Sequence, residues 1–225
     1  SCDNFLKSGA NMNELKQKKI AIVCDWLKDW WWAEQVLFDL LEIFPQADIY
    51  SSIFFEKNFP SLVGKVKSTF INQIPILRSK PKMVSFLRTY AFEWLDLSWY
   101  DIVISSASAE SKGIITRPET LHFCYCHTPT RYYWSHAHEY MKNPEFGWLN
   151  PIAKLFMPIV FHKMRIWDFI AAQRVNYFIA NSKTTAQRIK LYYHREAEVI
   201  APWIDESIYL PAEISTKNNI ALRLA

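Results

Sequence analysis

The sequence predicts an α/β fold built on a doubly wound, all-parallel sheet. Short apolar runs rich in β-branched residues recur along the chain, and segments with helical periodicity separate them. Strands that alternate with helices favour a parallel sheet with helices on both faces. Polar residues gather where the apolar runs end, which is typical of such a sheet with a ligand site at its carboxyl edge. The expected architecture is therefore Rossmann-like.

The N-terminal half supplies the first strands and helices. The run KIAIVC predicts a strand buried on both faces, and the helix after it should end at Pro45. The apolar stripe of that helix consists of Val36, Leu37, Leu40, Leu41 and Phe44. Altogether this half is expected to contain strands over residues 19–24, 47–54 and 65–70 and helices over 32–44 and 85–95.

The C-terminal half continues the alternation. Residues 100–105, YDIVIS, predict a strand that ends in a serine-rich turn, and residues 121–126, LHFCYC, predict a strand that ends at HTP. A strand over 175–180 leads into NSKTTAQRIKLYY, where Ser182 is placed to cap a helix. A last short strand is expected over 198–200.

Composition excludes several functional classes. The chain has 26 basic and 22 acidic residues, and a net charge of +4 is too small to argue for nucleic acid. It is compatible with a phosphate-bearing partner or an anionic membrane surface. The four cysteines show no zinc spacing, which favours a reducing cytoplasm. No uncharged apolar run reaches the ~18 residues of a membrane span, so the chain is expected to be soluble or peripheral.

Two stretches interleave aromatic with basic residues, 70–95 and 141–174, and the second has the least regular pattern of the chain. It mixes Trp148, Phe156, Phe161 and Trp167 with Lys154, Lys163 and Arg165. Such a composition suits a helix that lies on a membrane surface. It equally suits an amphipathic helix that covers the sheet. Both interpretations stay open.

His127 is the sharpest candidate for chemistry. It follows an apolar strand, and Thr128 and Pro129 after it fix an extended exit. A histidine at a strand end can donate to a sugar hydroxyl or move a proton near neutral pH. Alternatively, it ties down the loop.

Arg131 follows closely, in TRYYW. Its guanidinium could hold a phosphate or carboxylate, while Tyr132 and Trp134 could stack on a sugar or belong to the core. The polar residues at the other strand ends are further substrate-binding candidates. These are Ser106, Lys112, Asn181 and Ser182.

The sequence holds no complete catalytic motif. His136 and His138 would not face each other on a helix, and no carboxylate cluster supports a metal there. A P-loop, a nucleophile elbow, an HExxH zinc motif, a CxxC pair and a dinucleotide fingerprint are all absent. A standalone enzyme with its own small-molecule reaction is therefore the weakest hypothesis.

Several segments together resemble the retaining family 4 glycosyltransferases, most closely the bacterial mannosyltransferase-like branch that builds O-antigen and other surface polysaccharides. They are KIAIVCDWL, AEQVLFDLLEIFPQADIYSS, SSASAESKGI, LHFCYCHTPTRYYW and the run from RIWDF to APWID. They follow one another in the family's order over roughly residues 18–205. HTPTRYYW together with IANSKTTAQRI is the most specific part.

The resemblance implies a GT-B enzyme, in which two Rossmann-like domains face a cleft. The N-terminal domain would hold a saccharide or lipid-linked acceptor, and the C-terminal domain would bind a nucleotide-sugar donor without any catalytic metal or other cofactor. His127 would be the strand-end histidine near the transferred hexose. Arg131 would contact the acceptor or a phosphate. The expected location is cytoplasmic, at the inner face of the membrane if peripheral.

One departure concerns the turn after the first strand. The family carries a Gly-Gly pair before the AE of that turn, where bare backbone approaches the donor phosphates, and Trp31 and Trp32 align with it. An indole fills space that glycine leaves open. These tryptophans and Glu34 of the AE pair are counted among the substrate-side candidates. The alternative is a non-catalytic binding or partner subunit with a degenerate glycine loop.

Three parts of the chain are expected. Residues 1–17 are polar and read as a leader or cloning remnant, with Met12 as a candidate start. Residues 18–205 form the Rossmann-like acceptor domain. Residues 206–225 resemble a truncated tail toward a missing donor-binding domain, without which transfer is not expected.

Overall fold

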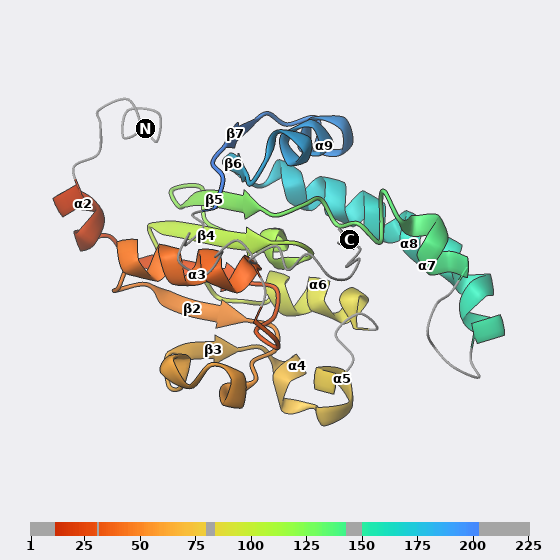
Figure 1. Ribbon diagram of the computed structural model, residues 1–225, viewed down its shortest axis with the longest axis horizontal. Coiled ribbons are helices and arrows are strands. Elements are labelled where there is room, and N and C mark those ends of the chain that lie inside the picture. The colour runs from red at the N-terminus through yellow and green to blue at the C-terminus, as the bar shows by residue number, and fades with distance from the viewer. Residues whose placement is uncertain (1–11, 31, 80–83, 143–149, 203–225) are drawn as a thin grey trace, which may run out of the picture.

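Seven strands form one all-parallel sheet in the order β3-β2-β1-β4-β5-β6-β7 (Figure 1). The computed structural model describes residues 12–30, 32–79, 84–142 and 150–202. The strands are β1 (Ile20–Cys24), β2 (Asp48–Ser51), β3 (Val66–Ser68), β4 (Ile102–Ala107), β5 (Leu121–Cys126), β6 (Tyr177–Ala180) and β7 (Ala197–Val199). This topology confirms the predicted Rossmann-like, doubly wound α/β fold.

Helices connect the strands. The α-helices are α2 (Met12–Gln17), α3 (Trp32–Ile43), α4 (Phe70–Gln73), α5 (Pro75–Ser79), α6 (Ser85–Glu93), α7 (Ala137–Lys142), α8 (Asn150–Gln173) and α9 (Lys183–Tyr193). Short 3-10 turns are η1 (Glu56–Asn58), η2 (Pro60–Leu62) and η3 (Ser111–Gly113). α2 falls in the segment expected to be a leader, and its Leu15 packs against the core.

The two faces of the sheet have separate cores because side chains alternate along each strand. Ile20 and Ile22 of β1 join the core that also contains Leu37 of α3. Ala21, the residue between them, faces the opposite side, where Phe92 of α6 packs. Helices therefore cover both faces, as the sequence predicts.

The order of the strands creates a switch point at the centre of the sheet. β1 pairs with β2 on one side and with β4 on the other. From β1 the chain adds β2 and β3 toward one edge of the sheet. It then returns to the other side of β1 and adds β4 to β7 toward the opposite edge. In sheets of this kind the crevice at the carboxyl ends of the two central strands is the usual ligand site. Here those ends are Cys24 of β1 and Ala107 of β4.

Most expected elements occur within a few residues of their expected limits. β5 has the expected bounds, whereas β4 ends two residues later than expected, so Ser106 and Ala107 belong to the strand and not to the turn. β2 ends at Ser51, three residues early. It ends there because Ile53 leaves the ladder, and its carbonyl accepts a hydrogen bond from the Leu27 amide at 2.7 Å.

The stretch 141–174, which has the least regular pattern, contains one continuous helix of 24 residues, α8. Its buried positions Phe161, Met164, Asp168 and Ala171 are spaced by three or four residues, as on one face of a helix. Pro158 interrupts the pattern but not the helix. The periodicity is hard to see in the sequence because the outer face of α8 is also largely apolar.

Candidate functional site

The carboxyl ends of β1, β4, β5 and β6 bring the strand-end polar residues to one edge of the sheet. Register pairs Cys24 with Ser106 across β1 and β4, and Cys126 with Ala180 across β5 and β6. The residues that follow these ends therefore lie along one line. They are Asp25, His127 and Asn181, with Ser106 beside them.

Ser106 and His127 form a hydrogen-bonded pair at this edge. The Ser106 hydroxyl lies 2.8 Å from His127 Nε2, and the His127 amide donates to the Ala107 carbonyl at 2.9 Å. Burial lowers the pKa of His127 from 6.5 to about 4. At neutral pH the imidazole is consequently uncharged. One ring nitrogen is engaged by Ser106, and the other can donate or accept a single hydrogen bond, according to the tautomer.

The start of α9 lies against the same histidine. Ser182 caps the helix, as predicted, by accepting a hydrogen bond from the Thr185 amide at 3.2 Å. The Thr185 hydroxyl in turn donates to the His127 carbonyl at 3.2 Å. The Ser182 hydroxyl itself donates to Asn181 Oδ1 at 3.1 Å. The structure thus brings four predicted residues together at the edge: Ser106, His127, Asn181 and Ser182.

Asp25 organises the turn that follows β4. Its two carboxylate oxygens accept hydrogen bonds from the backbone amides of Ser108, Ala109 and Ser111, at 2.6, 2.8 and 2.7 Å. Successive amides that converge in this way form an anion-binding nest. Because an internal carboxylate fills this nest, the turn is fixed by the chain itself.

The same turn carries two charged residues that point into the protein and form buried ion pairs. Glu110 pairs with Arg88 of α6 at 2.8 Å, and both side chains are fully buried. Glu110 also accepts hydrogen bonds from the hydroxyls of Tyr132 and Tyr133, each at 2.7 Å. Arg88 donates to Tyr132 at 3.2 Å. This buried network connects α6 to the segment after β5.

Lys112 forms the second buried pair, with Asp168 of α8 at 2.5 Å. Burial acts to lower the pKa of Lys112, but the charge of Asp168 outweighs it and raises that pKa. Asp168 also accepts from Trp134 Nε1 and from the Tyr193 hydroxyl, each at 2.7 Å. Both carboxylate oxygens of Asp168 therefore have hydrogen-bond partners in the interior.

These pairs determine where several predicted site residues lie. Lys112, Tyr132 and Trp134 direct their polar atoms toward Glu110 and Asp168 in the interior. Arg131 is exposed to solvent. Their roles as substrate contacts stay predictions.

The turn after β1 is described only in part. Glu34 is buried in α3. Trp32 is the first residue of that helix, and Trp31 lies outside the described residues. Trp30 is exposed, although its ring centroid lies 5.0 Å from that of Phe38 and 5.8 Å from that of Phe59. The predictions for Trp31, Trp32 and Glu34 therefore stay predictions as well.

Sequence reasoning missed Arg88, Glu110 and Asp168. Asp168 offered a signal, because it is the only acidic residue of α8 and shares the spacing of the buried apolar positions. An acid on the inner face of a helix is almost never buried without a partner. Arg88 and Glu110 gave no comparable signal, since both lie in polar or mixed surroundings in the sequence.

A second serine–histidine pair lies in the core. His122 Nε2 is 2.8 Å from the Ser105 hydroxyl, and both residues are fully buried. Burial and the nearby charge of Arg174 lower the pKa of His122 to about 3. His122 lies within β5 and not at its end. This position supports a structural role for His122.

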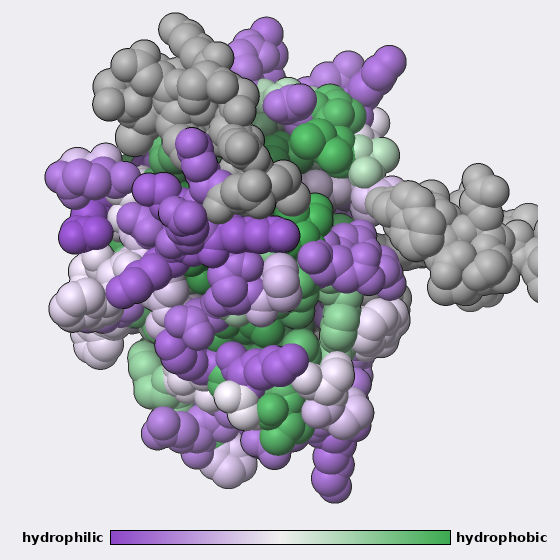
Figure 2. Space-filling model, turned by 90° about the vertical axis from the view of Figure 1, so that its left-hand side faces the viewer, coloured by the Kyte–Doolittle hydropathy of each residue, from purple (hydrophilic) through white to green (hydrophobic). Residues whose placement is uncertain are grey.

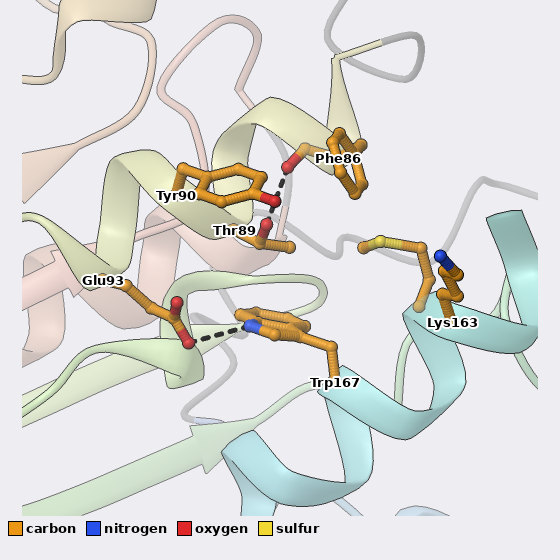
Figure 3. Close-up of a pocket in the computed structure, with 7 residues that line it drawn as sticks. Phe86, Thr89, Tyr90, Glu93, Lys163 and Trp167 are labelled. Atoms are coloured by element: carbon orange, nitrogen blue, oxygen red, sulfur yellow. Dashed lines mark hydrogen bonds between the residues drawn. The ribbon is translucent and has the colours of Figure 1, made fainter.

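The described residues contain no group of three or more histidine, cysteine or acidic side chains that could hold a metal ion. They do contain a pocket of about 240 Å³, which lies between α6 and α8 (Figure 3). Its lining comprises Phe86, Thr89, Tyr90, Glu93, Lys163, Met164 and Trp167. None of these is a predicted site residue.

No protein-family model matches the chain, and a comparison with curated proteins finds no significant match.

Proposed function

We propose that this chain is the acceptor-binding half of a retaining, GT-B-type glycosyltransferase. In this proposal the whole enzyme transfers a mannosyl-like hexosyl group from a nucleotide-sugar to a saccharide or lipid-linked acceptor in surface polysaccharide synthesis. The ordered resemblance over residues 18–205 supports the proposal. The doubly wound parallel sheet is the fold that such a half would need.

The observation that carries the proposal is the Ser106–His127 pair at the carboxyl edge of the sheet. An uncharged histidine can exchange hydrogen bonds with a sugar hydroxyl without competing for a counter-ion. Ser106 would hold the ring through Nε2 and leave Nδ1 to meet the acceptor. The exposed guanidinium of Arg131 lies a few residues away in the chain and would suit the phosphate of a lipid-linked acceptor.

A second candidate function is a non-catalytic binding or partner subunit. The observation that favours it is the substitution of Trp31 and Trp32 for the Gly-Gly pair of the resembled family. Two indoles at a donor-phosphate turn would hinder the close approach of a diphosphate. In this case the chain would still bind a saccharide but would never assist transfer.

Acceptor binding is the first test. Saturation-transfer NMR with saccharide and polyprenyl-phosphate saccharide probes should detect binding to the wild-type chain. His127→Ala should weaken binding at least about tenfold, because a buried hydrogen bond to a sugar is lost. His138→Ala, at an exposed histidine of α7, is the matched control and should bind normally. Equal binding by both variants would refute the role of His127.

Transfer distinguishes the two candidates. The chain is combined with a separately expressed donor-binding domain of the resembled family, with and without Trp31→Gly and Trp32→Gly. Sugar transfer by the wild-type chain with the donor domain supports the transferase, whereas transfer only after both tryptophans are replaced supports the binding subunit. Saccharide binding without transfer by both supports the binding subunit. Absence of both binding and transfer, with the fold intact by circular dichroism, overturns both candidates.

A further inference from the structure

The outer surface of α6 and α8 is apolar to an unusual degree. Every exposed residue of α6 is apolar or aromatic, and Trp94 at its end is 75% exposed. On α8 the exposed apolar side chains lie opposite its buried face, at helical spacing that only Lys163 interrupts between Val160 and Ile166. We call this surface the α6–α8 face; its members are Phe86, Leu87, Tyr90, Trp94, Leu155, Phe156, Ile159, Val160, Ile166 and Ile170.

The two helices form one continuous surface. Phe86 and Tyr90 of α6 line the same pocket as Lys163 and Met164 of α8 (Figure 3). Aromatic contacts extend the surface along α6, because Tyr90 packs between Phe86 and Trp94 with ring centroids 5.2 and 6.4 Å away. α8 is thus apolar on both of its sides. A helix of this kind is normally covered on both.

The exposed charges at this face are positive. α6 and α8 contain only two acidic residues, Glu93 and Asp168. Asp168 is buried with Lys112, and Glu93 is neutralised by Arg174 at 2.9 Å. By contrast, Lys154 and Lys163 of α8 are exposed, and Lys163 lies in the middle of the apolar stripe. The face therefore presents positive charge within an apolar surface.

The opposite end of the molecule has a different character. Figure 2 shows the end at which the strands begin, and its described surface is mostly hydrophilic, with apolar side chains in small separate patches. The apolar face is thus a local feature and not a property of the whole surface. Large exposed apolar patches of this kind mark sites of interaction.

We propose that the α6–α8 face binds the surface of an anionic lipid bilayer. The helices would lie in the plane of the membrane, with α8 covering about 36 Å at 1.5 Å per residue. Aromatic residues such as Trp94 and Tyr90 prefer the interfacial layer of a bilayer. Lys154 and Lys163 would meet lipid phosphates, while the isoleucine and leucine side chains enter the acyl boundary.

Charge complementarity favours this occupant over a second copy of the chain. In a symmetric dimer both copies would bring these lysines into the interface, with no exposed acid on α6 or α8 to pair them. An anionic bilayer supplies the counter-charge at any position. A membrane-spanning alternative does not apply to the described residues, where no helix is long and apolar enough to cross a bilayer. The inference stands independently of the proposed function.

Co-sedimentation with vesicles tests the proposal. The wild-type chain should pellet with a three-to-one mixture of phosphatidylcholine and phosphatidylglycerol, and pelleting should fall as salt is added. Lys154→Gln with Lys163→Gln should lower the partition coefficient about 30-fold, because each lysine near an anionic surface contributes roughly fivefold. The matched control is Lys57→Gln with Lys65→Gln, which removes two exposed lysines elsewhere and should bind normally.

A second pair of variants tests the apolar contribution. Phe156→Ser with Ile159→Ser should abolish pelleting, whereas Val63→Ser with Leu191→Ser, at exposed apolar positions outside the face, should not. All four positions are exposed, so thermal unfolding should stay near that of the wild type. Failure of the wild type to pellet at low salt overturns the proposal. It is also overturned if the face variants bind vesicles normally but lose a dimer detected by light scattering.

Discussion

Lowering the pH from 7 to 5 should destabilise the fold by about 4 kcal/mol, through the two histidines that the β4–β5 pair holds in an uncharged form. The pKa of His122 is lowered to about 3 and that of His127 to about 4, in both cases mainly by burial. In the unfolded chain each would titrate near 6.5. Below that value the unfolded state binds protons that the folded state refuses, so stability falls as the pH falls.

The size of the effect follows from these values. At pH 5 an unfolded histidine gains about 2 kcal/mol from protonation, and a folded one with a pKa of 3 or 4 gains almost nothing. Two such residues therefore remove about 4 kcal/mol of a typical 5–15 kcal/mol stability. Asp48 contributes little in this window, since its hydrogen bond from Tyr100 lowers its pKa from 3.8 and the carboxylate is protonated only at lower pH.

Urea unfolding at pH 7 and pH 5 measures this difference. His122→Gln should reduce the loss between the two pH values by about half, because glutamine does not titrate but can still meet Ser105. His127→Gln should reduce it similarly. His138→Gln, at an exposed position on α7, is the control and should leave the loss unchanged. The same pH-dependent loss in all three variants would refute the assignment of the effect to buried histidines.

Three further predictions concern the elements that hold the strand edge. Gly113→Ala should destabilise the fold by about 1–3 kcal/mol, because its new Cβ would lie 2.4 Å from the Trp167 ring; an unchanged denaturant midpoint would contradict this. Lys112→Met should cost about 3–5 kcal/mol of unfolding free energy by leaving Asp168 buried without its cation. Adding Asp168→Asn, which removes the charge but keeps an acceptor oxygen for Trp134 and Tyr193, should restore part of the loss in the same denaturation assay; a double variant less stable than the single one would argue against the pair. Ser182→Ala should cost about 1 kcal/mol through loss of the α9 cap, and a thermal midpoint equal to that of the wild type would show that the cap contributes nothing.

The sequence contained enough information to predict the sheet but not the contacts beneath its edge. Buried strands such as β1 and β5 are recognisable because continuous apolar runs have few other uses in a protein of this size. Ser182 and His127 could be placed because caps and strand ends are local features. α8 was harder to recognise, since a helix that is apolar on both sides shows no alternation of apolar and polar residues at helical spacing.

The ion pairs could not be predicted for a different reason. Lys112 and Asp168 are 56 residues apart in the chain, and nothing in either local segment indicates the other. Asp25 is separated from the turn that it organises by more than 80 residues. Long-range pairing of this kind depends on the packed fold, so only the three-dimensional structure reveals which of several charged residues meet.

The turn after β4 also has a consequence for inheritance. Its two inward charges, Glu110 and Lys112, pair with residues of different helices. Each charge therefore depends on a residue far away in the sequence and not on its neighbour in the loop. A single change at any of the four positions leaves an unmatched charge in the interior, whereas a paired change can be tolerated. In descendants of this sequence, Glu110 should covary with Arg88 and Lys112 with Asp168. The two pairs should vary independently, although Glu110 and Lys112 lie in the same short loop.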